Sequence, residues 1–219
     1  CTGNHPEGMP MPDDASADIT RDACPEAPAV PRPDTRPVAT APAPGATEAL
    51  RLLVIIGHPR RDSLCAGLAA AYVAGARGTG CTVEVLDLAE MRFDADVTAA
   101  SPASQPLEPD LEKARNLIDW AQHLVFVFPN WWGMMPARLK GFLDRVLYPG
   151  FAFREDGGHY YGLLAPRTAE LLITMDVPPL VYRWIQGAPG EKAVTRATLG
   201  LCGITTVAAT TFAPPSHAD

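Results

Sequence analysis

Two short, uninterrupted apolar runs constrain the fold of this chain more than any other feature. Residues 52–56 and residues 124–128 contain no polar side chain, which is the pattern of a strand buried on both faces. Neither run approaches the roughly 18 apolar residues of a membrane span. Strands buried on both faces belong to parallel sheets that are covered by helices on each side. The chain is therefore expected to be an α/β protein without a transmembrane segment.

The rest of the chain after residue 50 alternates strand-like and helix-like segments. Further strands are expected at residues 81–86, 169–174 and 203–209, and helices at residues 64–76, 111–121, 139–147 and 191–202. Five strands alternating with helices predict a doubly wound parallel sheet. Residues 216–219 have the form of a helix N-cap, so one more helix is expected to begin there. An extension of about 15 to 20 residues, the length of an ordinary helix, is expected to stabilise the chain.

Residues 1–50 differ in composition from residues 51–219. They hold ten of the 23 prolines and eight acidic against three basic side chains. Because this segment has hardly a large hydrophobe, it cannot bury enough surface to offset the entropy of ordering it. A disordered, acidic, Pro/Ala-rich tail is expected at 1–50, followed by one domain at 51–219. The net charge of −7 provides no basic field for a nucleic acid partner.

Neither the cysteines nor the histidines form a recognisable framework. The five cysteines include no CxxC pair and the five histidines lie far apart, so we expect no disulfide framework and no metal site. The sequence starts at Cys1, as a bacterial lipoprotein does after its signal peptide is removed, but a fragment of a longer sequence would start in the same way. The main expectation is a cytoplasmic protein, and the alternative is a lipoprotein anchored through Cys1.

The loop after the first expected strand carries groups that bind phosphate. Residues 57–65 bring Arg60, Arg61, the Ser63 hydroxyl and a helix N-terminus to one place, a combination that suits an anion. The loop contains neither the Walker pattern nor the GxGxxG fingerprint. The alternative interpretation is that Ser63 only caps the helix.

The loop after the third expected strand is rich in aromatic and sulfur-containing side chains. Residues 128–136 include Trp131, Trp132, Met134 and Met135, which could bind a flat ligand at the carboxyl end of the sheet. The alternative is that both tryptophans pack in the core or in a subunit interface. A loop between a buried strand and a helix is not core, so two tryptophans there indicate a ligand or a partner.

These loops resemble those of one family. His58-Pro59 with Ser63, residues 128–146, and residues 149–153 are similar to the flavodoxin-like NAD(P)H:quinone reductases, and the likeness covers about residues 51–215. It implies a five-stranded parallel sheet of order 2-1-3-4-5, with the last helix apparently missing. It also implies FMN or FAD as cofactor, NAD(P)H as hydride donor, a quinone or similar small acceptor, and a homodimer.

The resemblance implies roles for individual residues. The flavin phosphate loop falls on His58, Ser63, Leu64 and Cys65, the ring-binding loop on Pro129, Asn130, Trp131, Trp132 and Gly133, and the third flavin loop on Thr174, Met175 and Asp176. The family's third loop is typically Thr-Thr-Gly-Gly, and both glycines are absent here, so any approach of the backbone to the flavin that relies on glycine must differ.

The substrate side of the resemblance is less complete. The family's tyrosine falls on Tyr182, which is the candidate catalytic residue, whereas the histidine of its quinone-reductase branch falls on Ala188. Two alternatives to an enzyme stay open: a regulatory or ancillary subunit of a transporter, and a domain that has lost its flavin. Three further side chains in these segments have simpler interpretations. Lys140 and Arg145 are expected to be solvated, and Cys65 to be either a redox-active thiol or a small buried hydrophobe.

Overall fold

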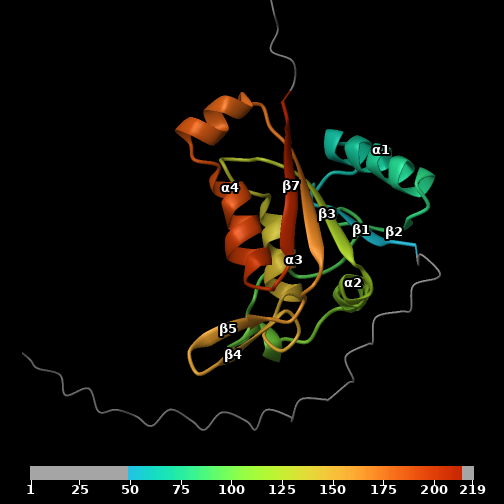
Figure 1. Cartoon of the computed structure of the whole chain (residues 1–219). Coiled ribbons are helices and arrows are strands. Elements are labelled where there is room, and N and C mark those ends of the chain that lie inside the picture. The colour runs from blue at the N-terminus through green and yellow to red at the C-terminus, as the bar shows by residue number, and fades with distance from the viewer. Residues whose placement is uncertain (1–48, 214–219) are drawn as a thin grey trace, which may run out of the picture. The chain divides into compact units, whose positions relative to one another are not determined.

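The computed structural model describes residues 49–213 (Figure 1). The predicted tail up to residue 48, Cys1 and the predicted helix start at residues 216–219 lie outside the described residues. Within residues 49–213, no helix is long and apolar enough to cross a membrane. In the same part of the chain, no group of three His, Cys, Asp or Glu side chains could hold a metal ion.

Five parallel strands form the central sheet, in the order β2-β1-β3-β6-β7. Their bounds are β1 (Arg51–Ile56), β2 (Thr82–Asp87), β3 (His123–Pro129), β6 (Thr168–Thr174) and β7 (Thr205–Phe212). Since β4 and β5 belong to a separate hairpin, this is the predicted order 2-1-3-4-5, and the predicted fold is confirmed.

Helices cover the two faces of the sheet. On one face, Leu52 and Val54 of β1 pack against α1 (Leu64–Gly78). On the other, Leu53 and Ile55 join a larger core. That core includes α2 (Pro109–Trp120), α3 (Ala137–Val146) and η3 (Ala193–Gly200), a π-helix. Because side chains alternate along a strand, both faces of β1 are buried, as its continuous apolar run indicates.

Two regions differ from the sequence prediction. β4 (Phe153–Asp156) and β5 (His159–Gly162) form an antiparallel hairpin that the sequence analysis does not predict. Gly157 and Gly158 connect the strands with φ of 59° and 80°, as the turn of a two-residue hairpin requires. The Gly157-Gly158 pair is the sequence signal from which this hairpin could have been predicted.

The helical segment before β7 is also divided. Instead of one helix at residues 191–202, the chain forms η2 (Val181–Ile185), a π-helix, then α4 (Pro189–Lys192) and η3. In η2 the Gln186 amide donates to the Val181 carbonyl, 3.1 Å away, five residues back. Apolar spacing does not distinguish such a turn from an α-helical one, which is why the sequence did not predict it. A shorter helical turn, η1 (Pro102–Ser104), lies in the loop after β2.

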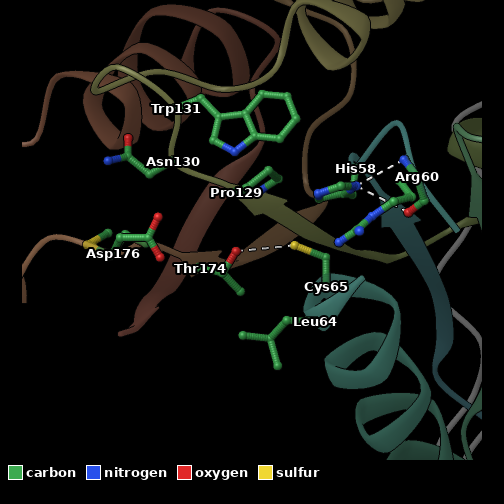
Figure 2. A pocket seen from close by; sticks show the side chains of 10 residues that line it. His58, Arg60, Leu64, Cys65, Pro129, Asn130, Trp131, Thr174 and Asp176 are labelled. Atoms are coloured by element: carbon green, nitrogen blue, oxygen red, sulfur yellow. Dashed lines mark hydrogen bonds between the residues drawn. The ribbon is translucent and has the colours of Figure 1, made fainter. Parts of the chain in front are cut away.

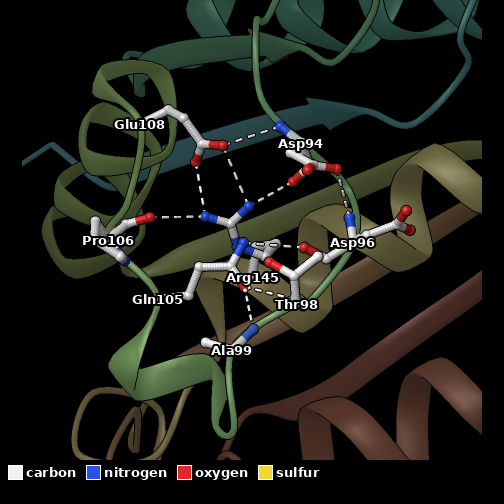
Figure 3. Close-up of polar contacts among 8 residues, drawn as sticks. All are labelled: Asp94, Asp96, Thr98, Ala99, Gln105, Pro106, Glu108 and Arg145. Carbon is white, nitrogen blue, oxygen red and sulfur yellow. Dashed lines mark hydrogen bonds and ion pairs between the residues drawn. The ribbon is translucent and has the colours of Figure 1, made fainter.

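The side chain of Arg145 in α3 is buried, with 1% of its surface exposed, so the prediction that it is solvated was wrong. Its guanidinium donates to the carbonyls of Asp94 at 2.6 Å and Pro106 at 2.8 Å, as Figure 3 shows. It also pairs with both oxygens of Glu108, at 2.8 and 3.3 Å. A forked guanidinium suits such a set of acceptors. Arg145 therefore fastens the long segment between residues 94 and 108 to α3.

The partners of Arg145 are themselves held in place. Burial alone would raise the pKa of the Glu108 carboxyl, but hydrogen bonds from the Asp94 amide and the Arg145 guanidinium bring that pKa below its usual 4.5. One turn before Arg145 on the same helix, Gly141 lies so close to Ala95 that a Cβ on Gly141 would overlap Ala95. The segment thus meets α3 through the ion pair of Arg145 with Glu108, the bonds of Arg145 to two backbone carbonyls, and the close contact of Gly141 with Ala95.

Replacing Arg145 tests how much this network stabilises the fold. Arg145→Met leaves Glu108 Oε2 and two carbonyls without the donor that Arg145 provides, so we expect a loss of about 3 kcal/mol in folding free energy, the lower end for removing one partner of a buried pair. Lys140→Met is the matched control, because Lys140 forms an exposed pair with Asp144 that contributes less than about 1 kcal/mol. Urea denaturation measures both. Equal stabilities of the two variants would contradict the assigned role.

Candidate functional site

A pocket of about 400 Å³ lies at the carboxyl ends of β1, β3 and β6 (Figure 2). From β1 the chain crosses one face of the sheet to β2, and from β3 it crosses the other face to β6, so the two loops separate at this edge. The residues that line the pocket are His58, Arg60, Leu64, Cys65, Pro129, Asn130, Trp131, Thr174, Met175 and Asp176. All three predicted flavin loops contribute to this set.

The first loop leads from β1 into the N-terminus of α1. The Gly57 amide donates to the Val127 carbonyl at 2.8 Å, which continues the sheet by one residue. Ser63 caps α1, since its hydroxyl accepts a hydrogen bond from the Ala66 amide at 3.2 Å, and it is not among the residues that line the pocket. Leu64, the first residue of α1, does line the pocket. The first turn of α1, with its free amides and the positive end of the helix dipole, therefore faces the pocket.

His58 connects the first loop to the second. Its Nδ1 accepts a hydrogen bond from the Arg60 amide at 2.9 Å. Burial lowers the pKa of His58 below 6.5 and outweighs the backbone contact with Arg60, which raises it. The lowered pKa favours the neutral imidazole at pH 7, and Nδ1 also lies 3.1 Å from the Arg60 carbonyl oxygen. Its ring meets that of Trp131 edge-on, with centroids 5.3 Å apart.

The second loop is a tight reverse turn that separates the two tryptophans. Trp131 and Met134 exchange backbone hydrogen bonds of 2.8 and 3.0 Å, and Trp132 and Gly133 between them have φ of 53° and 78°. Positive φ at both central positions defines a type I′ turn. Trp131 lines the pocket, whereas Trp132 is fully exposed at the tip. Neither Trp132 nor Gly133, which were predicted to bind the cofactor, contacts the pocket.

The third loop begins where β6 ends. The Thr174 carbonyl accepts a hydrogen bond from the Asn130 amide at 2.7 Å, and its hydroxyl lies 3.3 Å from the Cys65 sulfur. Burial raises the pKa of the Cys65 thiol, so this sulfur stays protonated at neutral pH and is a poor nucleophile. Of the two interpretations, the structure favours the small buried hydrophobe. The loops after β1, β3 and β6 are thus joined through Thr174.

Tyr182 lies in η2 and is completely buried. Its hydroxyl accepts a hydrogen bond from the Glu191 amide at 3.0 Å, and Tyr182 is not among the residues that line the pocket. This contact connects η2 to the first turn of α4.

Arg60 lines the pocket, whereas the resemblance to the family gives it no role. The sequence signal for this position is that Arg60 lies in the loop that follows a buried strand.

The lining residues have complementary properties at the two ends of the pocket. Arg60 and the N-terminus of α1 attract an anion at one end. Trp131 presents an aromatic surface, and Asn130 and Thr174 present polar groups, where a planar ring can lie. The arrangement can bind a molecule that combines a phosphate with a flat heterocycle.

Comparisons with known proteins agree with the fold. A family model described as flavodoxin-like fold matches residues 50–219. An FMN-dependent NADH:quinone oxidoreductase of Ruegeria pomeroyi is 36% identical over 156 residues, which cover 63% of this chain and 73% of that protein. A ribosyldihydronicotinamide dehydrogenase [quinone] of Mus musculus is 28% identical over 183 residues, 72% of this chain and 79% of that protein.

Solved structures show the same arrangement of elements. A protein from Streptococcus mutans superposes with a TM-score of 0.68 at 29% identity, covering 78% of this chain and 90% of that one. An NAD(P)H:quinone oxidoreductase from Methanothermobacter marburgensis gives a TM-score of 0.66 at 24% identity, with the same coverage. At that identity the second likeness supports the fold alone.

Two glycine substitutions test how the first loop is positioned. A Cβ on Gly57 would lie 2.7 Å from Leu139 Cδ2 and 3.1 Å from Phe128 Cβ, both in the core, so Gly57→Ala should cost about 1 to 3 kcal/mol. A Cβ on Gly75 in α1 would meet no atom within 4 Å, and Gly75→Ala should gain about 0.5 to 1 kcal/mol from helix propensity. Thermal denaturation measures both. If Gly57→Ala were as stable as the unmodified protein, the loop would not be fixed by this contact.

Proposed function

Because the chain belongs to the flavodoxin-like fold family, we propose that it is a flavin-dependent oxidoreductase that passes two electrons from NAD(P)H to a quinone or similar small acceptor. The observation that carries this proposal is the pocket at the ends of β1, β3 and β6, where an anion-binding end faces an aromatic surface. The names of the Ruegeria pomeroyi and mouse relatives support the reaction class.

The pocket residues fit a flavin mononucleotide. The volume of about 400 Å³ is within the usual range of small-molecule sites, about 300 to 1,000 Å³. Arg60 and the first amides of α1 would hold the phosphate. Trp131 would pack on the ring, and Asn130 would offer its amide to the ring edge. We propose FMN as the cofactor, with FAD as the alternative.

In the proposed reaction, the residues of the protein would position the flavin and shield its ring from water. The bound flavin would supply the two-electron chemistry. Arg60 would neutralise the phosphate, while Trp131 and Pro129 would exclude water from the ring. Cys65 contributes packing rather than a thiolate, since burial raises the pKa of its thiol. The proposed reaction needs no side-chain nucleophile.

We also propose that two copies associate at the edge of the sheet where the pocket opens. Trp132, Leu180, Trp184 and Ile185 are all largely exposed. The turn that carries Trp132 packs against α4, because a Cβ on Gly190 would lie 2.5 Å from the Gly133 carbonyl. The hydrogen bond between the Glu191 amide and the Tyr182 hydroxyl joins α4 to η2, which carries Trp184 and Ile185. Exposed apolar side chains on segments joined in this way mark an interface. Covering them with a second copy would enclose the mouth of the pocket.

Identification of the flavin tests the proposed function directly. We expect the purified protein to be yellow, to release FMN on heating, and to oxidise NADH or NADPH when a soluble quinone is added. Chromatography of the released flavin and absorbance at the nicotinamide band measure the two properties. Bound flavin without turnover would favour a regulatory subunit. A folded, colourless protein that takes up neither FMN nor FAD would show that the domain has lost its flavin.

Alanine substitutions of the two tryptophans distinguish their roles. Trp131→Ala should weaken FMN binding by about 1 to 3 kcal/mol, the usual contribution of an aromatic side chain stacked on a base or ring. Trp132→Ala is the matched control and should leave the affinity within about threefold, which corresponds to less than 1 kcal/mol. Quenching of flavin fluorescence measures both dissociation constants. A larger loss in Trp132→Ala would show that the ring packs on Trp132 instead.

A further inference from the structure

Asp176 places a carboxylate at one end of the pocket. It is the second residue after the end of β6, and both Thr174 and Asp176 line the pocket. Met175 between them is buried and also packs against the core. Asp176 is exposed and lines the pocket. In Figure 2 it lies beside Asn130, across the pocket from Arg60.

The charge of Asp176 is not matched by a neighbouring cation. Within residues 49–213, no ion pair or hydrogen bond engages its carboxylate. The opposite end of the pocket carries the Arg60 guanidinium and the N-terminus of α1, which both attract anions. The pocket is therefore polarised: it favours negative charge near Arg60 and disfavours it near Asp176.

This polarity orients a ligand that has a phosphate and a ring. The phosphate would bind at the Arg60 end, which would leave the ring at the end that holds Asp176, Asn130 and Trp131. Charges close to a flavin ring are a means by which proteins tune its reactivity. A carboxylate there acts on the redox state of the ring, because reduction changes the charge of the ring.

We propose that Asp176 lowers the reduction potential of the flavin bound in this pocket, an inference that rests on the proposed function. A hydride from NAD(P)H carries two electrons and one proton. The nicotinamide gains one positive charge when it loses the hydride, and the flavin ring gains one negative charge when it accepts it. The carboxylate of Asp176 repels this added charge. The reduced flavin is therefore held less tightly than the oxidised flavin, and it gives up its electrons more readily to the acceptor.

Asp176→Asn tests this proposal, because it removes the charge and keeps the shape. We expect the redox equilibrium of bound FMN to shift about tenfold toward the reduced form, which corresponds to about 30 mV for a two-electron couple. Asp176→Glu, which keeps the charge, should stay within about threefold, or about 15 mV. Titration of the FMN-loaded proteins against a redox dye measures the potential. The affinity for oxidised FMN, measured by fluorescence quenching, is the second readout.

Asp156→Asn is the matched control. It removes the same charge from the hairpin of β4 and β5, which lies at the end of the sheet away from the pocket (Figure 1), and it should leave the potential unchanged. Equal potentials in the unmodified protein and in Asp176→Asn, with FMN bound to both, would overturn this inference and leave the proposed function intact. An unmodified protein that binds no FMN would overturn both. If Asp176→Asn did not fold, Asp176→Ser would serve as the uncharged variant, with the same expected shift.

Discussion

The directions in which the chain leaves β1 and β3 determine where this protein can bind a ligand. These two strands lie side by side and parallel, yet the helix that follows β1 covers one face of the sheet and the helix that follows β3 covers the other. Their loops must therefore separate at the carboxyl edge. No side chain creates the opening, which follows from the strand order alone. The side chains of the loops decide only what the opening binds.

The elements of the fold were predictable where local pattern determines them. The apolar runs in β1 and β3 have both faces buried in the structure, as the sequence indicates. Arg145 shows where local pattern fails, because its environment is made by residues far away in the chain. Helical spacing alone does not indicate that Glu108 and the carbonyl of Pro106 lie above α3. A charged side chain can occupy a core position when hydrogen-bond acceptors surround it. The spacing of apolar residues in the sequence does not reveal those acceptors.

The candidate site was predictable to the level of its loops and not to the level of each side chain. Nine of the predicted residues line the pocket, since the loop that follows each strand is evident from the sequence. The type I′ turn separated Trp131 from Trp132, and turns of this kind are ordinarily built from Asn and Gly. A tryptophan with positive φ contradicts that preference. Tyr182 was assigned by resemblance alone, and its contact with the Glu191 amide depends on π-helical geometry that the sequence does not reveal.

The two ends of the pocket are built by different parts of the chain, so each end can vary separately. The phosphate end is built by the loop before α1, whose position depends on Gly57 and the cap of Ser63. The ring end is built by residues after β3 and β6. The contacts between these ends include the hydrogen bond between Cys65 and Thr174 and the edge-on contact of His58 with Trp131. The contacts proposed for the phosphate, from Arg60 and the helix amides, lie at one end of the pocket, whereas Asp176 acts through its charge on the ring at the other end. A substitution such as one at Asp176 can therefore alter electron transfer while the cofactor stays bound.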